Sequence, residues 1–229
     1  YESALASSRG AGESAGSGGG SAVAVGDFTI TAPDGVKTLT IHGQNFIVNG
    51  VFTAGSVTTP QGNTLNVTAF NAATGKVTYS YTLLDNEAHA GVQGNNGLLD
   101  NLVVTATDND GQIQTGTLAI NIVDDVAQAN SDTGSVGAGV YTPVAVAASL
   151  GVLANDVFGA DGQAAGGGVV GVAKGATGAD RQQAGTVGSV VEGAYGKLTL
   201  NADGSYSYTR NAGTPGGVTD VFTYTVKDG

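Results

Sequence analysis

The sequence predicts an all-β protein made of two tandem β-sandwich domains, and three observations lead to this prediction. Glycine accounts for 39 of the 229 residues and proline for only 4, without a Gly-X-Y period, so many turns are expected and a collagen-like fold is excluded. Short runs with alternating apolar residues recur from Asp27 onward, separated by turn residues. A weak internal repeat divides the chain into two parts.

The expected strands follow one another along the first half of the chain. Each run has the period of two that is typical of a strand with one buried face. In order, the runs are DFTITAPDG, VKTLTIHG, QNFIVNG, GNTLNVTAF, GKVTYSYTLL, NLVVTATD and GTLAINIVDD. The later stretch VAVAASLGVLAN could be scored as a helix, but Gly151 and its β-branched residues disfavour one. Little helix is therefore expected.

A glycine-rich segment, ASSRGAGESAGSGGGSA at residues 6–22, precedes these strands. It has almost no large apolar side chain, so little offsets an ordering entropy of roughly 1–2 kcal/mol per residue. We expect a flexible loop or extended connection that packs poorly.

The internal repeat sets the predicted domain boundaries. TGKVTYSYTLLDN resembles ADGSYSYTRNAG, GNTLNV resembles GKLTLN, and GLLDNLVVTATD resembles GVTDVFTYTVKD. In the last pair, the spacing from Asp100 to Asp108 equals that from Asp220 to Asp228. The predicted domains are 1–126 and 127–229, placed end to end by the short join VDDVAQANSD. The second repeat stops after TVKD, so its last strand is expected to be missing.

Composition excludes several classes of function. The chain has no Cys, so disulfides, thiolate metal sites and thiol nucleophiles are impossible. It has no Met either, which suggests a segment of a longer protein. No apolar run approaches the ~20 residues that span a bilayer, so membrane insertion is not expected. The net charge of −11 argues against nucleic acid as a partner, because phosphate binding needs clustered Lys and Arg.

The acidic residues are unevenly spread. Between Lys76 and Lys174 there is no basic side chain, whereas the same stretch carries ten acids. Local salt bridges cannot neutralise these charges, so the stretch is either a solvated acidic surface or a binding region for divalent cations. We favour calcium, because it takes six to eight hard oxygen ligands, whereas magnesium demands near-ideal octahedral geometry.

The candidate calcium ligands lie in turns. Asp108 and Asp110 belong to a D-N-D-G turn, and further carboxylate and amide oxygens cluster near the domain join. The alternative for each turn is an Asx motif that satisfies its own backbone. The full candidate set is Glu2, Asp108, Asp110, Asp124, Asp125, Asn130, Asp132, Asn155, Asp156, Asp161 and Asp228, the last being the repeat equivalent of Asp108.

A strand at about 112–123 separates the two acidic clusters, which predicts that they lie at opposite ends of the first domain. At the join, we expect Asp124, Asp125, Asn130 and Asp132 to meet loops of the second domain near Asn155, Asp156 and Asp161. At the other end, we expect Asp108 and Asp110 to meet the chain start near Glu2, or a preceding domain.

Enzyme motifs are weak in this sequence. GESAG matches the G-x-S-x-G pattern but lies in the low-complexity segment, and GGGVVG lacks a surrounding βαβ unit. The only histidines, His42 and His89, are expected at the surface, and their number excludes a three-histidine zinc site. We therefore predict no catalytic residues.

Taken in order, the motifs are similar to a known family. The stretch from FTITAPDGVKTLTI to VVTATDNDGQIQTGTLAINIVDDVAQA resembles the extender repeats of giant type I-secreted bacterial adhesins of the RTX class. The stretch from ANSDTGSV through GVLANDVFGADG to DVFTYTVKDG resembles the related VCBS-type, cadherin-like repeat.

The resemblance implies tandem Ig-like or cadherin-like β-sandwiches that act as an extender of a secreted adhesin at the bacterial cell surface. It implies calcium at the junctions, neighbouring repeats as partners, and a role in surface attachment or biofilm formation. The alternative function is a module that binds a glycan or a protein on a target surface.

Overall fold

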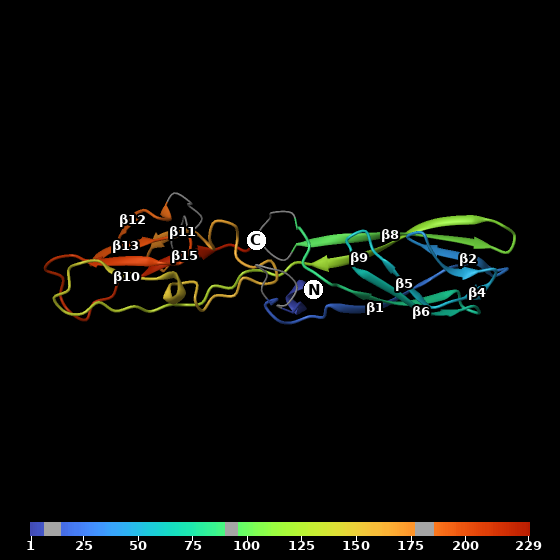
Figure 1. Cartoon of the computed structure of the whole chain (residues 1–229), viewed down its shortest axis with the longest axis horizontal. Coiled ribbons are helices and arrows are strands. Elements are labelled where there is room, and N and C mark those ends of the chain that lie inside the picture. Colours follow the sequence, from blue (N-terminus) through green and yellow to red (C-terminus); the bar gives the residue numbers. More distant parts are fainter. Residues whose placement is uncertain (7–14, 90–95, 177–185) are drawn as a thin grey trace. The chain divides into compact units, whose positions relative to one another are not determined.

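The computed structural model describes residues 1–6, 15–89, 96–176 and 186–229, and it is all-β, as the sequence predicts (Figure 1). Within these residues the helices are single 3-10 turns, η1 (Glu2–Ala4) and η2 (Ala148–Leu150). None of the helices in this part of the chain is long and apolar enough to cross a membrane. Outside the segment 10–17, the chain forms two compact units that divide between Asp125 and Val126.

The first unit consists of two antiparallel sheets. The four-stranded sheet has the order β1-β7-β6-β5, and the five-stranded sheet has the order β4-β3-β2-β8-β9. β8 and β9 form the long hairpin visible in Figure 1. The bounds are β1 (Val23–Thr29), β2 (Val36–Ile41), β3 (Gln44–Val48), β4 (Val51–Phe52), β5 (Gly55–Thr58), β6 (Thr64–Asn71), β7 (Lys76–Thr82), β8 (Gly97–Asp108) and β9 (Ile113–Val123).

The core of the first unit draws alternate residues from both sheets. Leu39 and Ile41 come from β2, while Leu65 and Val77 come from β6 and β7, and all four side chains are fully buried. Full burial of such a side chain stabilises the fold by about 1.5–3 kcal/mol relative to exposure. The alternating pattern of the sequence therefore marks the buried face of each strand.

The second unit is a smaller sandwich with sheets β10-β14-β13-β12 and β11-β15. Val169, Val172, Leu198 and Leu200 form its buried centre. The stretch VAVAASLGVLAN, considered above as a possible helix, forms β10 and the single turn η2. The bounds are β10 (Val144–Val146), β11 (Val169–Lys174), β12 (Val190–Glu192), β13 (Gly196–Leu200), β14 (Tyr206–Arg210) and β15 (Phe222–Val226).

The predicted glycine-rich loop at 6–22 lies partly outside the described residues, because 7–14 are not among them. Gly18 to Ser21 are exposed, in keeping with poor packing of side chains. Hydrogen bonds nevertheless join them to the chain start: Gly18 N–H donates to the Ser3 carbonyl at 2.8 Å, and the Ser3 hydroxyl donates to the Gly19 carbonyl at 3.0 Å.

Gly75, in the β6–β7 turn, offers a test of the turn chemistry. Its φ of +70° is a left-handed conformation, and an added Cβ would overlap the carbonyl oxygen of Ile30. We expect Gly75→Ala to destabilise the first unit by more than about 2 kcal/mol, since the left-handed conformation alone costs about 1–2 kcal/mol. Gly62→Ala is the control, because Gly62 has a φ of +87° with open space around it. If denaturant unfolding showed that both variants lose the same amount of unfolding free energy, the steric explanation would be contradicted.

Candidate functional sites

The β8–β9 hairpin places the two acidic clusters at opposite ends of the first unit, as predicted. Thr107 pairs with Ile113 at one end of the hairpin, and Gly97 pairs with Val123 at the other. Asp108 therefore lies at the first end, and Asp124 directly follows β9 at the second. The two clusters cannot share an ion.

The turn after β8 largely satisfies its own polar groups. Asp108 Oδ1 accepts the Gln112 N–H at 2.8 Å, and the Gly111 N–H donates to the Asp108 carbonyl at 3.2 Å. The Asp110 N–H donates to Asp34 Oδ2 at 3.0 Å, so Asp34 is a third carboxylate that the sequence analysis missed. The hydrogen bonds fit the Asx-turn alternative for Asp108.

Glu2 is not near this turn, so the expectation that it meets Asp108 and Asp110 is wrong. The turn η1 places Glu2 at the opposite end of the first unit, near His89 and Asp124. One potential ligand atom from each of these three residues lies within 4.8 Å of the other two. Figure 1 shows the chain start beside the end of β9. Glu2 is completely buried, and its Oε1 accepts the Glu87 N–H at 2.5 Å. The Asp124 N–H donates to the Asn96 carbonyl at 3.0 Å, and this hydrogen bond fixes the backbone of Asp124.

More acidic groups gather at this end than the sequence analysis proposed. Burial raises the pKa of Glu87, and the charges of Asp100 and Asp85 raise it further. The hydrogen bond from Asn63 lowers this pKa but does not cancel the rise. Asp125 is also buried, with 4 % of its surface exposed. Glu87 follows β7, in the connection that leads to β8, and its N–H donates to Glu2, so it belongs to the same end of the first unit.

His89 also differs from its prediction. It was expected at the surface, but its side chain is only 5 % exposed, whereas His42 is exposed in the turn between β2 and β3. His89 Nε2 lies 3.2 Å from Glu2 Oε1. The acidic loop that follows β7 therefore also contributes an imidazole to the interior of this end.

The internal repeat appears in the structure as a pair of equivalent contacts. In the first unit the Tyr81 hydroxyl donates to Asp100 Oδ2 at 2.8 Å, and in the second the Tyr208 hydroxyl donates to Asp220 Oδ2 at 2.7 Å. These are the Tyr and Asp positions that the repeat aligns. Burial raises the pKa of Tyr208 to about 12, with its hydrogen bond to Asp220 contributing. The repeated sequence thus encodes a repeated hydrogen bond.

Asp220 should make the second unit sensitive to acid. Burial alone would raise its pKa, but hydrogen bonds from Tyr208 and from the Ala194 and Tyr195 N–H groups bring it below its usual value. Such a carboxyl stabilises the native state above the unfolded pKa of about 3.9, and this stabilisation is lost as pH falls through the lower folded pKa. Asp220→Asn should therefore flatten the loss of stability from about pH 5 to pH 2 in denaturant unfolding. An unchanged slope would argue against this role.

An oxygen cluster surrounds the Tyr224 hydroxyl in the second unit. The hydroxyl lies 2.8 Å from the Asn130 carbonyl, 2.9 Å from Asp132 Oδ2 and 3.1 Å from the Val152 carbonyl. Asp156 adds Oδ1 at 3.2 Å and Oδ2 at 3.1 Å. We call these four residues and Tyr224 the Tyr224 cluster. A hydroxyl has one proton, so it cannot serve five acceptor oxygens at once.

Further hydrogen bonds hold this cluster in place. The Asn130 N–H donates to Asp156 Oδ1 at 2.6 Å, and the Asn130 side-chain amide donates to the Asn155 carbonyl at 2.7 Å. Burial raises the pKa of Asp156, and the charge of Asp132 adds to this rise, whereas the hydrogen bonds from Asn130 and Tyr224 oppose it. Burial also raises the pKa of Tyr224, so its hydroxyl keeps its proton. The structure thus brings together four predicted residues: Asn130, Asp132, Asn155 and Asp156.

Asp228 makes a different contact, and its neighbour Gly229 lies next to Asp161: a Cβ added at Gly229 would come within 2.8 Å of the Asp161 carbonyl oxygen. Asp228 Oδ2 accepts the Ala127 N–H at 2.9 Å, and the Gly229 N–H donates to the Gly162 carbonyl at 3.1 Å. Asp228 also pairs with Gln163 through an isolated bridge. Asp228 therefore joins the beginning and the end of the second unit, a different role from that of its repeat equivalent Asp108.

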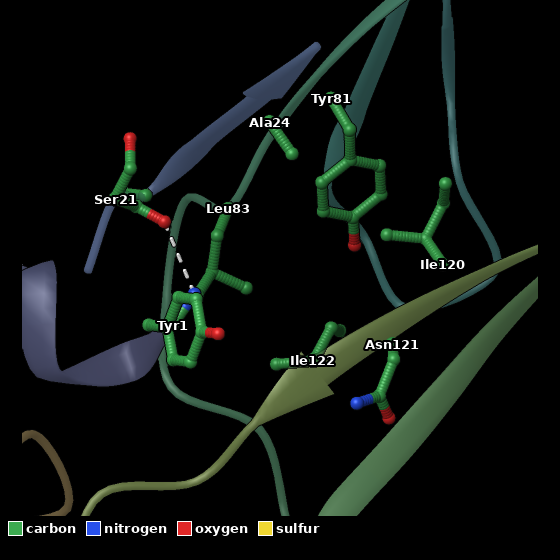
Figure 2. Close-up of a pocket in the computed structure, with 9 residues that line it drawn as sticks. Tyr1, Ser21, Ala24, Tyr81, Leu83, Ile120, Asn121 and Ile122 are labelled. Atoms are coloured by element: carbon green, nitrogen blue, oxygen red, sulfur yellow. Dashed lines mark hydrogen bonds between the residues drawn. The ribbon is translucent and has the colours of Figure 1, made fainter. Parts of the chain in front are cut away.

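A small hollow lies beside the first residue of the chain. Figure 2 shows Tyr1, Leu83 and Ile122 around it, and the Tyr1 amino group donates to the Ser21 carbonyl at 3.1 Å. Its volume is about 30 Å³, which leaves room for roughly one or two water molecules. This hollow is therefore too small to bind a sugar.

A comparison with known protein families finds a match for the part of the chain that forms the second unit. Residues 124–229, slightly less than half of the chain, match a family model described as a bacterial Ig domain. Such domains are structural or adhesion modules of surface proteins and are typically not enzymes. No curated protein matches the chain in sequence. For residues 124–229, the expected resemblance to repeats of bacterial surface proteins is confirmed at the level of the Ig-like domain.

Proposed function

We propose that the chain is a calcium-stabilised extender segment of a large secreted bacterial adhesin, with neighbouring repeats of the same protein as its partners. The observation that carries the proposal is the Tyr224 cluster, in which two carboxylates and two main-chain carbonyls point at one hydroxyl. Carboxylate and carbonyl oxygens are the ligands that calcium prefers. The single hydroxyl proton of Tyr224 can form a hydrogen bond with only one of them at a time.

Calcium would act here by removing a repulsion. Asp132 and Asp156 both lie within hydrogen-bonding distance of the Tyr224 hydroxyl, so their carboxylates are close to each other. A divalent cation between them would neutralise both charges and could also accept the carbonyl oxygens as ligands. Asn130 and Asp132 follow the boundary between the units by only a few residues. Bound calcium would therefore also restrain the connecting segment, which suits an extender.

The alternative, a module that binds a glycan or a protein, finds less support in the described residues. Tyr206, Tyr208 and Tyr224 pack against the core of the second unit instead of forming an exposed aromatic surface for sugar stacking. The hollow near Tyr1 is too small for a ligand of this kind.

Calcium titration of the intact chain tests the proposal. We expect calorimetry to detect calcium binding, and we expect thermal melting to occur at higher temperature in calcium than in excess chelator. Binding to the native state alone adds about 2.7 kcal/mol of stability when the free calcium concentration is a hundred times Kd. Magnesium at equal concentration is the control and should have a smaller effect. Identical melting in calcium and chelator would contradict the proposal.

A further inference from the structure

The end of the first unit that contains η1 holds three potential ligands: Glu2, which is buried, and His89 and Asp124, which are partly buried. One ligand atom from each lies within 4.8 Å of the others. They come from three distant parts of the chain, namely the first turn, the loop after β7 and the residue after β9. The fold therefore brings them together, and no local turn explains their proximity.

The imidazole of His89 is the second, independent observation. Its side chain is 5 % exposed, and neither ring nitrogen has a hydrogen-bond partner within the described parts of the chain. Buried polar groups are nearly always hydrogen-bonded, so each exception needs an explanation. A metal ion that accepts the lone pair of one ring nitrogen would provide one.

The distance between His89 and Glu2 fits two ligands of one ion. His89 Nε2 lies 3.2 Å from Glu2 Oε1, yet the pair does not have hydrogen-bond geometry. Zinc binds nitrogen and oxygen ligands at about 2.0–2.1 Å with tetrahedral geometry, which places neighbouring ligand atoms about 3.3 Å apart. The Glu87 N–H, which donates to Glu2 Oε1 at 2.5 Å, would orient this carboxylate from outside the ligand shell.

We propose that Glu2, His89 and Asp124 bind a divalent transition-metal cation such as Zn²⁺. Two carboxylates would neutralise the charge of the ion, and the imidazole nitrogen selects it, because imidazole suits zinc, copper and nickel whereas calcium takes oxygen ligands. This site is separate from the Tyr224 cluster in ligand type and in the unit that provides it. The inference therefore does not depend on the proposed calcium function.

Metal titration of the intact chain after chelator treatment tests the site, with Zn²⁺ for calorimetry and Co²⁺ as an absorbing substitute. The variants are His89→Gln and the control His42→Asn, which alters an exposed histidine with a φ of +45°. We expect the wild-type chain and His42→Asn to bind one Zn²⁺ equally. His89→Gln should weaken binding at least tenfold, since even partners outside the ligand shell change metal affinity by about 10- to 100-fold.

Two further measurements separate the possible outcomes. Nitrogen-15 NMR should show a zinc-induced shift of one His89 ring nitrogen in the wild-type chain, a result that does not depend on a variant folding. Asp156→Asn should keep full Zn²⁺ affinity, so failure of the calcium proposal would leave this result intact. Equal Zn²⁺ affinity of the wild-type chain and His89→Gln, or an unshifted His89 ring in saturating Zn²⁺, would overturn the proposed site.

Discussion

Replacing Tyr81 by phenylalanine is expected to destabilise the first unit by about 2–4 kcal/mol. Asp100 is completely buried, and the Tyr81 hydroxyl donates to its Oδ2 at 2.8 Å. The other oxygen, Oδ1, has no hydrogen-bond partner in the described residues. Loss of the hydroxyl would therefore leave a buried carboxylate without its donor. Denaturant unfolding of the intact chain, followed at neutral pH, measures the change.

The repeat provides a matched control for this experiment. Tyr208→Phe removes the equivalent hydroxyl in the second unit, but Asp220 keeps the N–H groups of Ala194 and Tyr195 as donors. Asp220 is also partly exposed, so water can replace the lost bond. We expect a loss of only about 0.5–1.5 kcal/mol. If Tyr208→Phe proved as damaging as Tyr81→Phe, burial of Asp100 would not be the reason for the larger effect.

The strands and the repeat could be predicted from sequence because both are local patterns. Alternation marks the residues that a strand buries, and Leu39, Ile41, Leu65 and Val77 are buried as this pattern requires. The equal spacing of Asp100–Asp108 and Asp220–Asp228 correctly aligned two acids that each accept a tyrosine hydroxyl. What the spacing could not show is that Asp108 and Asp228 have different partners, since these partners come from outside the repeated segment.

The end of the first unit that holds Glu2 could not be assigned from local pattern. Glu2 precedes a long glycine-rich segment, whose composition does not specify the direction in which the chain returns to β1. Its position beside Asp124 and His89 depends on contacts between residues far apart in sequence. His89 was misplaced for the same reason, because a single histidine in a loop carries no periodic signal of burial.

The Tyr224 cluster was only partly visible in the sequence. Its carboxylates lie in acid- and amide-rich turns, which is why Asn130, Asp132, Asn155 and Asp156 were predicted to meet. The Val152 carbonyl and the Tyr224 hydroxyl complete the cluster. A main-chain carbonyl has no sequence signature, and Tyr224 has the alternating pattern of an ordinary strand residue. Side-chain composition can therefore indicate a cluster of oxygens without giving its full set of members.

The Asp156→Asn variant is expected to lower stability in calcium but not in excess chelator. In excess chelator the ionised Asp156 is unfavourable, because burial and the nearby charge of Asp132 raise its pKa above the usual range. A carboxyl with a raised folded-state pKa destabilises the native state at neutral pH. The asparagine oxygen can still accept the Asn130 N–H, and the new amide can donate to Asp132. The chelated variant should therefore be as stable as the wild-type chain, or more stable.

In calcium the same substitution should remove most of the stabilisation, because it removes one of the two carboxylates that would hold the ion. The stability that calcium adds to the wild-type chain, about 2.7 kcal/mol at a hundred times Kd, should fall towards zero in Asp156→Asn. Hydrogen exchange of peptides from β15 follows the second unit directly, and Asp203→Asn, an exposed acid of the same unit, is the control. If Asp156→Asn lowered stability equally in calcium and in chelator, the carboxylate would serve only its hydrogen bonds to Asn130 and Tyr224, and the oxygen cluster would not be a calcium site.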